Sequence, residues 1–411
     1  MATLPSTTTK AVGDAASSAE LRELLQWFAR EKQWINDRHL ELCRIPAPTF
    51  FEQARAEWMK EQFEEAGYEA GIDRSGNVVA SMPGRPEGTA IAVTAHLDTV
   101  MAPRNPEREV SFGADGKFHG PGVSDNGAGL AALLALARAI QTCNRDDFRD
   151  IVFVANVGEE GEGNLSGMRY LCRQSPLSTR LAALLVLDGP ATDHITCQAL
   201  ASRRFDISVG GPGGHSWSDY GVGNPVHALS RAIALFTDTP LNAAGRPRSS
   251  LNFGIVEGGL SVNSIPASAR AKLDIRSESV ERLEELSAVL AGCVEKAVEV
   301  ENERASGGRV SARITDIGTR PGGGLAEDAA ILRVLRAVDA HLAIRAQVDC
   351  ASTDANIPLS MGIPAVAIGA GGSGGGAHTP GEWYNPEARD LGLRRIALAL
   401  YLMLRQSDAL A

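Results

Sequence analysis

The stretch that decides the fold is Ile91-Ala-Val-Thr-Ala-His96-Leu-Asp98, an apolar run that ends in a histidine and an aspartate two positions apart. A short run rich in β-branched residues and closed by polar ones is typical of a buried central strand. Open α/β sheets bind their ligands at the carboxyl ends of the strands. Because residues i and i+2 of a strand share a face, we expect His96 and Asp98 to act at one centre, as two ligands or as one ligand with its orienting partner.

Two further apolar runs repeat this pattern. Residues 151–157 lead into Glu159 and Glu160, and residues 184–187 lead into Asp188. Helical patterns separate the runs, among them an Ala/Leu-rich segment at 130–141 that follows a glycine-rich turn. Alternating strands and helices predict an α/β catalytic domain with a mostly parallel sheet flanked by helices, and with its chemistry along one edge of that sheet.

The pattern changes near residue 202. From there the sequence predicts a strand, a helix, two strands, a helix and a strand, which is the ferredoxin-like α+β order. The chain then returns to α/β patterns. We therefore expect a disordered lead-in at 1–18, a catalytic domain in two parts at 19–202 and 319–411, and an inserted domain at 203–318.

Composition restricts the class of protein. Hydrophobic residues make up 44% of the 411 positions, which is enough for a large core. The net charge of −10 and the lack of Lys/Arg-rich runs argue against a nucleic-acid partner. No apolar run reaches the roughly 18 residues that a membrane span needs. The six cysteines are scattered without a CxxC pair, and the start of the chain lacks the apolar core of a signal peptide, so we expect a cytoplasmic protein.

The residues at these strand ends and in later loops have the composition of a metal centre. They are His96, Asp98, Asp125, Glu159, Glu160, Asp188 and His378. Two histidines with several carboxylates and no cysteine suit Zn, Mn or Co in a two-metal site with one bridging carboxylate. Metals about 3.5–4 Å apart lower the pKa of a shared water. A carboxylate that is not a ligand, here one of the glutamate pair, would then be the general base.

Each of these residues also has a structural explanation when it is taken alone. Asp125 lies where a helix N-cap is expected, and Glu159 with Glu160 could form a solvated acidic turn. The glycine-rich turn at 120–129 could cradle a phosphate, but a nucleotide site would also need a Lys or Arg there, and the turn has none. The concentration of carboxylates and histidines at successive strand ends favours the metal centre.

Eight motifs, in order, make the chain from about residue 20 onward resemble the M20 family of metallopeptidases, which includes carboxypeptidase G, tripeptidase T and the aminoacylases. The motifs are HLDTV (96–100), GPGVSDNGAG (120–129), GEEGEG (158–163), LDG (187–189), GGHSW (213–217), NSIPASA (263–269), STDAN (352–356) and AHTPGEW (377–383). The resemblance implies that the inserted domain is a lid and a dimerisation domain. It also implies a homodimer and two divalent metal ions, most simply Zn, with Mn or Co as alternatives.

The resemblance further implies which residues hold the metals. His96, Asp125 and Asp188 would hold one ion. Asp125, Glu160 and His378 would hold the other, so that Asp125 is the bridge. The peptide bond that follows Asp125 would be cis.

The remaining implied roles concern catalysis and substrate binding. Asp98 would orient the histidine of its own motif, and Glu159 would be the general base. His215 would polarise the scissile carbonyl and stabilise the oxyanion, in this family often from the partner subunit. Asn263 and Arg276 would grip the substrate, with Arg276 as the clamp on a free carboxylate.

The expected activity is hydrolysis of an amide bond in a small peptide or an N-acyl amino acid, by a hydroxide that bridges the metals. Asn126-Gly127 stands where many peptidase-like members carry Asp-Lys, which argues against placement in the tripeptidase branch. The alternative within the same fold is a deacylase that acts on a small N-acyl metabolite, and Arg276 and the shape of the pocket would decide between the two. A protein of another class, which keeps the fold and binds without catalysis, is disfavoured because every ligand and both glutamates are present.

Overall fold

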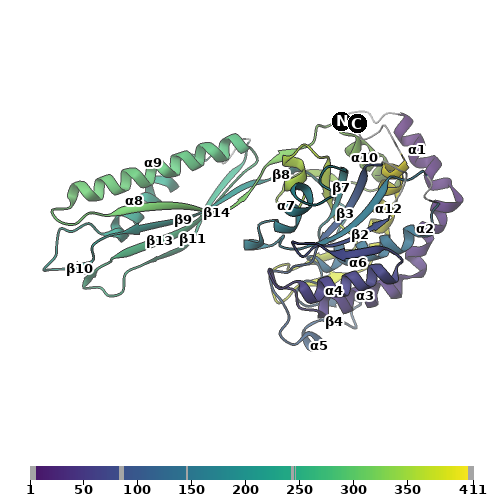
Figure 1. The fold of residues 1–411 in the computed structure, drawn as a ribbon, viewed down its shortest axis with the longest axis horizontal. Helices are drawn as coiled ribbons and strands as arrows, with labels where there is room; N and C mark the ends of the chain where they lie inside the picture. Colours follow the sequence, from purple (N-terminus) through teal and green to yellow (C-terminus); the bar gives the residue numbers. More distant parts are fainter. Residues whose placement is uncertain (1–5, 83–87, 145–146, 242–244, 246, 406–411) are drawn as a thin grey trace. The chain divides into compact units, whose positions relative to one another are not determined.

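The computed structural model describes residues 6–82, 88–144, 147–241, 245 and 247–405. The chain forms two compact units (Figure 1). The first comprises the residues up to Ala199 together with those from Gly324 onward, and the second is the insert Leu200–Gly323. The insert expected from the sequence runs from 203 to 318, within five residues of each of these boundaries.

A nine-stranded sheet forms the centre of the first unit. Its middle consists of β6 (Asp150–Asn156), β3 (Ala90–His96), β7 (Leu181–Leu187) and β17 (Ala365–Ile368), which are neighbours in that order and run parallel. Every residue of β3 is buried, because helices cover both faces of the sheet. The α/β class with a mostly parallel sheet, predicted from the sequence, is confirmed.

Five further strands extend the sheet on both sides. They are β1 (Glu69–Ile72), β2 (Val78–Met82), β8 (His194–Ala199), β15 (Gly323–Gly324) and β16 (Gln347–Ala351). A separate four-stranded sheet pairs β4 (Ser111–Phe112) and β5 (Phe118–His119) with β18 (Ser373–Gly375) and β19 (Trp383–Asn385). This small sheet brings the loop before residue 120 next to the loop that contains residue 378.

Two apolar cores pack against the two faces of the large sheet. The helices of the larger core are α2 (Ala19–Arg30), α3 (Lys32–Arg44), α4 (Gln53–Glu65), α6 (Gly127–Ile140), α10 (Ala330–Leu342) and α12 (Arg389–Arg405). The opposite face is covered by α7 (Ser166–Arg173) and α11 (Asn356–Ser360). Helix α6 is almost wholly buried, as its Ala/Leu composition on all sides requires.

The N-terminal segment differs from the expectation. Residues 1–18 were expected to be disordered, but Ser6–Ser17 form a helix, α1, that contacts α10 and α12; residues 1–5 lie outside the described part. Val12 is fully buried, and Ala11, Ala15 and Ala16 pack beside it. The small side chains make this apolar face weak in the sequence, and packing against two other helices supplies the stability that a short isolated helix lacks.

The second unit has the strand–helix–strand–strand–helix–strand order predicted for the insert. Its elements are β9 (Ala201–Gly210), α8 (Pro225–Thr237), β11 (Ser249–Gly258), β13 (Ser268–Ser277), α9 (Val280–Arg304) and β14 (Ser311–Arg320). The sheet is antiparallel with the order β11-β13-β9-β14. Both helices pack on the face where alternate residues of β13 are buried, and ion pairs such as Arg204–Asp274 lie along the sheet.

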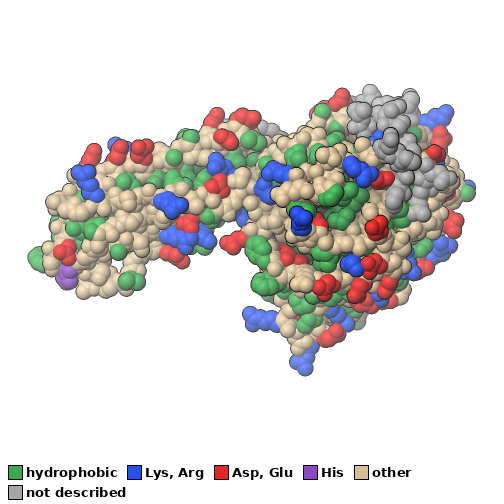
Figure 2. Space-filling model, in the orientation of Figure 1, with side chains coloured by type: hydrophobic (Ala, Val, Ile, Leu, Met, Phe, Trp, Pro, Cys, Tyr) green, Lys and Arg blue, Asp and Glu red, His purple; other side chains and the backbone are tan. Residues whose placement is uncertain are grey.

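The surface carries charges of both signs. Lys and Arg side chains are interspersed with Asp and Glu on the face drawn in Figure 2. Among the helices that the structure describes, none combines the length and the apolar composition needed to cross a membrane. All six cysteines are free thiols.

Candidate active site

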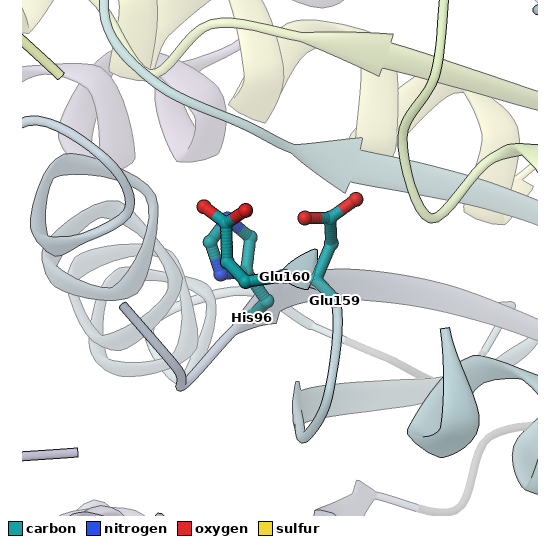
Figure 3. Close-up of side chains that lie close together, drawn as sticks. All are labelled: His96, Glu159 and Glu160. Atoms are coloured by element: carbon teal, nitrogen blue, oxygen red, sulfur yellow. The ribbon is translucent and has the colours of Figure 1, made fainter. Parts of the chain in front are cut away.

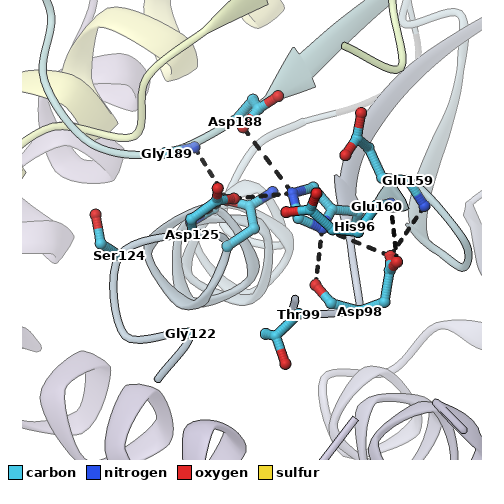
Figure 4. Close-up of polar contacts among 12 residues, drawn as sticks. His96, Asp98, Thr99, Gly122, Ser124, Asp125, Glu159, Glu160, Asp188 and Gly189 are labelled. Atoms are coloured by element: carbon cyan, nitrogen blue, oxygen red, sulfur yellow. Dashed lines mark hydrogen bonds and ion pairs between the residues drawn. The ribbon is translucent and has the colours of Figure 1, made fainter. Parts of the chain in front are cut away.

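His96 ends β3 at the carboxyl edge of the sheet, with only 2% of its surface exposed. Its Nδ1 lies 2.9 Å from the backbone carbonyl oxygen of Asp98 (Figure 4). Because a carbonyl oxygen can only accept, Nδ1 carries a proton and donates it. In the neutral ring Nε2 is then the lone-pair nitrogen, which is the usual arrangement of a metal-binding histidine. Nε2 is directed toward Asp125.

Asp98 does more than the sequence predicts. Its carboxylate is 3.6 Å from Nδ1 of His96, so the backbone carbonyl makes the closer contact with the ring. The carboxylate instead accepts the N–H groups of Glu159 and Glu160, at 3.0 and 2.9 Å (Figure 4). It also accepts the hydroxyl of Thr49 at 2.9 Å. Burial opposes ionisation of Asp98, but His96 and these N–H groups outweigh it and lower the pKa. Asp98 therefore fixes the turn that presents both glutamates.

Asp125 presents one carboxylate oxygen to each histidine. Its Oδ1 is 3.1 Å from Nε2 of His96, and its Oδ2 is 3.1 Å from Nε2 of His378. Glu160 Oε1 lies 3.0 Å from the same nitrogen of His378, and Asp188 Oδ1 lies 3.9 Å from Nε2 of His96. The structure thus brings the five predicted ligands into two groups that share Asp125.

These spacings fit divalent ions. Ligand atoms about 2.0–2.1 Å from a tetrahedral Zn²⁺ are roughly 3.3 Å from one another. A third grouping is also compact: His96, Glu159 and Glu160 can bring one ligand atom each within 4.8 Å of one another. In Figure 3 the carboxylate of Glu160 overlaps the imidazole of His96, and the carboxylate of Glu159 lies to one side of them, within the same compact grouping. The geometry therefore places Glu159 next to the metal ligands.

The electrostatics of the site are those of a cation site. Burial lowers the pKa of His96, but the neighbouring carboxylates of Asp125 and Asp98 outweigh it and raise the pKa well above the usual value. The hydrogen bond to Asp125 raises the pKa of His378 to about 9. Burial raises the pKa of Glu160 to about 7. The raised pKa values of both histidines mean that the carboxylates around them favour positive charge where metals would bind.

The loop that carries Asp125 is held by a carboxylate that the sequence reading missed. Glu382, only 3% exposed, accepts the N–H groups of Gly122 and Ser124 at 2.7 Å and that of Asp125 at 2.8 Å. The glycine-rich turn does bind an anion through its backbone, but the anion is this side chain. The only signal in the sequence is the position of Glu382, four residues after His378 in the last motif.

Asn126 leaves the Asp125 carboxylate available. The N-cap of α6 is Asn126, whose side-chain oxygen accepts the N–H of Gly129 at 3.1 Å. Its side-chain amide donates to the carbonyl of Leu187 at 2.8 Å, which ties the loop to the end of β7 beside Asp188. The Asp125–Asn126 peptide bond is cis, as the resemblance implies. The N-cap explanation therefore applies to Asn126 and not to Asp125.

The other predicted residues belong to the second unit. His215 lies in β10 (Gly214–His215), which pairs with β12 (Ser264–Ile265), and Asn263 directly precedes β12. His215 Nδ1 accepts the N–H of Trp217 at 3.2 Å, so its Nε2 is the donor nitrogen of the neutral ring. Both His215 and Asn263 are exposed. Arg276, on β13, donates from Nε to Asp274 at 2.7 Å.

Known proteins resemble this chain in sequence and in fold. The profile of peptidase family M20/M25/M40 matches residues 92–402. A succinyl-diaminopimelate desuccinylase of Bradyrhizobium diazoefficiens is 29% identical over 249 residues, which cover 56% of this chain and 61% of that protein. The chain thus aligns with less than two thirds of the length of this relative.

Solved structures extend the likeness to nearly the whole chain. A tripeptidase of Staphylococcus aureus has a TM-score of 0.75 at 21% identity and covers 91% of this chain and 99% of its own. A dinuclear metal-binding peptidase of the M20 family from Bacillus subtilis has a TM-score of 0.67 at 17% identity and covers 90% of this chain and 98% of its own. Since the profile match spans more than half of the sequence and includes the predicted ligands, the resemblance is confirmed, and the chain belongs to peptidase family M20/M25/M40.

Proposed function

We propose that the protein hydrolyses an amide bond in a small peptide or an N-acyl amino acid, with two divalent metal ions, most simply Zn²⁺. The observation that carries the proposal is the Asp125 carboxylate, which meets His96 with one oxygen and His378 with the other. A carboxylate in this arrangement can bridge two ions, with Asp188 completing one ligand set and Glu160 the other. When bound, two such ions lower the pKa of a water molecule and polarise the substrate carbonyl.

Glu159 is proposed as the general base. It removes a proton from the attacking water and passes it to the departing amine nitrogen, so that a single carboxylate serves both steps. Its backbone N–H is fixed by Asp98, and 5% of its surface is exposed, so the proton is transferred in a site largely closed to bulk water. Asp98 also keeps Nε2 of His96 available through the backbone carbonyl contact.

His215 is proposed to donate Nε2–H to the developing oxyanion, and Asn263 beside it to bind substrate. Arg276 lies eight residues along β13 from Ser268, the end of the strand nearer to β10, which is about 27 Å. One small substrate therefore cannot touch His215 and Arg276 of the same chain. This supports a homodimer formed through the insert, in which His215 acts on the site of the partner subunit.

Two substrate classes are compatible with this site. A peptidase is supported by the tripeptidase likeness in fold, and a deacylase of a small N-acyl metabolite is supported by the relative named as a desuccinylase. Both reactions break an amide bond and both leave an α-carboxylate that Arg276 could bind. Which of these substrates is cleaved distinguishes the peptidase from the deacylase.

The test is release of amino acid from a panel of dipeptides, tripeptides and N-acyl amino acids. Metal-stripped protein should be inactive, and Zn, Mn or Co should restore turnover. Glu159→Ala should bind the metals and remain inactive. Metal binding without turnover on any amide would favour a silent binding protein, and absence of metal binding would refute the proposal.

A further inference from the structure

A polar pocket of about 610 Å³ begins at the metal ligand Asp188 and lies within the first unit. Its lining comes from β7, β8, β16 and β17 and from the segments beside them, and it includes Asp193, Arg345, Asp349 and Thr353. Apart from Asp188, no residue that lines this pocket has a role in the function proposed above. Because it opens beside a metal ligand, a substrate bound at the metals can extend into it.

The strand directions place Arg345 at the same edge of the sheet as Asp188. Strand β16 runs parallel to β8, β8 pairs antiparallel with β17, and β17 runs parallel to β7. Strand β16 therefore runs opposite to β7. Residues just before β16, such as Arg345, lie at the edge where residues just after β7, such as Asp188, also lie.

The register gives the lateral separation between the strands that lead to Arg345 and Asp188. Asp349, Thr196, Ala367 and Val186 are aligned across these four strands. Three spacings between neighbouring strands amount to about 14 Å. The long side chain of Arg345 spans part of this distance, and the remainder accommodates about two residues of extended chain at ~3.5 Å each.

The charges of the pocket leave Arg345 available to an anion. Asp349 accepts the hydroxyl of Thr196 at 2.5 Å, and Asp193 is 3.3 Å from Nδ1 of His194. Within the described part of the chain Arg345 makes no hydrogen bond or ion pair, and it is exposed. A guanidinium group matches a carboxylate through two parallel N–H···O bonds.

We propose that Arg345 forms a second substrate subsite, which binds a carboxylate about two residues beyond the scissile amide. This inference rests on the proposed function, and it restricts the substrate to molecules with a distal negative charge. That charge is either the C-terminus of a short peptide or the far end of a dicarboxylic acyl group. Arg276 is a different candidate clamp, already bonded to Asp274.

The test compares substrates with and without the distal charge. Tri-alanine is paired with its C-terminal amide, and N-adipoyl-alanine with N-hexanoyl-alanine, which distinguishes the two sources of the carboxylate. Arg345→Met should raise KM for the charged member of one pair roughly tenfold to hundredfold and leave its kcat and the uncharged member unchanged. Arg345→Lys should restore part of the effect. Arg30→Met, an exposed arginine at the end of α2, is the matched control.

A binding measurement separates this inference from the proposed function. Calorimetry with tri-alanine and N-adipoyl-alanine is performed on metal-loaded Glu159→Ala protein, with and without Arg345→Met. If a charged probe binds more weakly to the double variant than to Glu159→Ala, the subsite is supported even if no amide is ever cleaved. If Arg345→Met changes neither the KM of either charged substrate nor the affinity for either charged probe, the inference is overturned.

Discussion

The edge of the large sheet and the insert hold their candidate residues in opposite ways. At the sheet edge, His96 and Asp98 are buried, and each is fixed by hydrogen bonds to backbone groups. In the insert, His215 and Asn263 are exposed on short strands and loops. The first arrangement is preorganised for metal before any substrate arrives. The second holds its polar side chains at the surface, through hydrogen bonds to residues close in sequence such as Trp217 and Ser261.

This difference has a consequence for mutations. Changes at the sheet edge should alter metal binding or the proton transfer that takes place beside the metals. Changes in the insert should leave the metals in place and alter turnover alone. Metal content and kcat, measured together, therefore separate the two regions.

The largest effect is expected for Glu159→Gln. Loss of a general base lowers kcat by roughly 10²–10⁴-fold, while two metals per chain should remain bound. Steady-state kinetics measures kcat, and atomic emission measures the number of metals bound per chain. If the variant loses a metal, Glu159 belongs to the ligand set with His96 and Glu160, and the general base is a different residue.

The next effect tests the insert. His215→Ala should lower kcat by about 10²–10³-fold with unchanged metal content, because one donor to the oxyanion is lost. Mixing this variant with Glu159→Gln should restore activity if His215 acts across a dimer, since each mixed pair contains one intact site. Failure of mixing to restore activity, in a dimer that exchanges subunits, would place His215 in its own chain's site.

A smaller effect is expected for Glu382→Gln. The amide would place N–H groups against one of the backbone donors of Gly122, Ser124 and Asp125, and so displace the bridging carboxylate. Metal affinity should fall roughly tenfold to hundredfold, as for other groups that orient ligands. Competition with a chromophoric chelator measures this metal affinity.

The control for Glu382→Gln is Asp339→Asn, which alters a buried carboxylate paired with Arg395 in the same unit. This variant should lower stability and leave metal affinity unchanged. Equal losses of affinity in both variants would show that Glu382 contributes to the fold in general and not to the metal loop.

Much of this site could be predicted from the sequence. Apolar strands that end in acidic or histidine residues indicate both a buried sheet and the edge of that sheet where the site lies. His96, Glu160 and Asp188 each follow a run whose period and length identify a buried strand. Glu382 could not be found in this way. Its partners are backbone N–H groups about 260 residues away, and backbone groups leave no mark in a sequence.

Contacts that leave no mark in the sequence also explain the other features that only the structure shows. Asp98 was expected to orient His96, and the structure adds that its backbone carbonyl lies closer to the ring than its carboxylate does, which depends on the local turn. Helix α1 carries only small apolar residues, so its order depends on packing against α10 and α12. Local patterns identify elements, and long-range packing decides which groups within them meet.

The last effect concerns pH, and it again separates the sheet edge from the insert. The hydrogen bond to Asp125 raises the pKa of His378 to about 9, whereas a metal needs the neutral ring. Between pH 6.5 and 9, metal affinity should therefore rise about tenfold per pH unit for each proton displaced. Calorimetry in buffers of different ionisation enthalpy counts these protons.

Stability should show the opposite trend without metal. A pKa raised above the unfolded value of about 6.5 means that protonated His378 stabilises the metal-free fold below that pH. This contribution is lost as pH rises toward 9, so the gap in melting temperature between metal-loaded and metal-free protein should widen over the same range. His378→Gln should reduce the number of protons released when metal binds, and it should weaken the pH dependence of the gap in melting temperature. His215→Ala should change neither quantity. A gap independent of pH would mean that protons do not occupy the ligand atoms of His378 when the metal is removed.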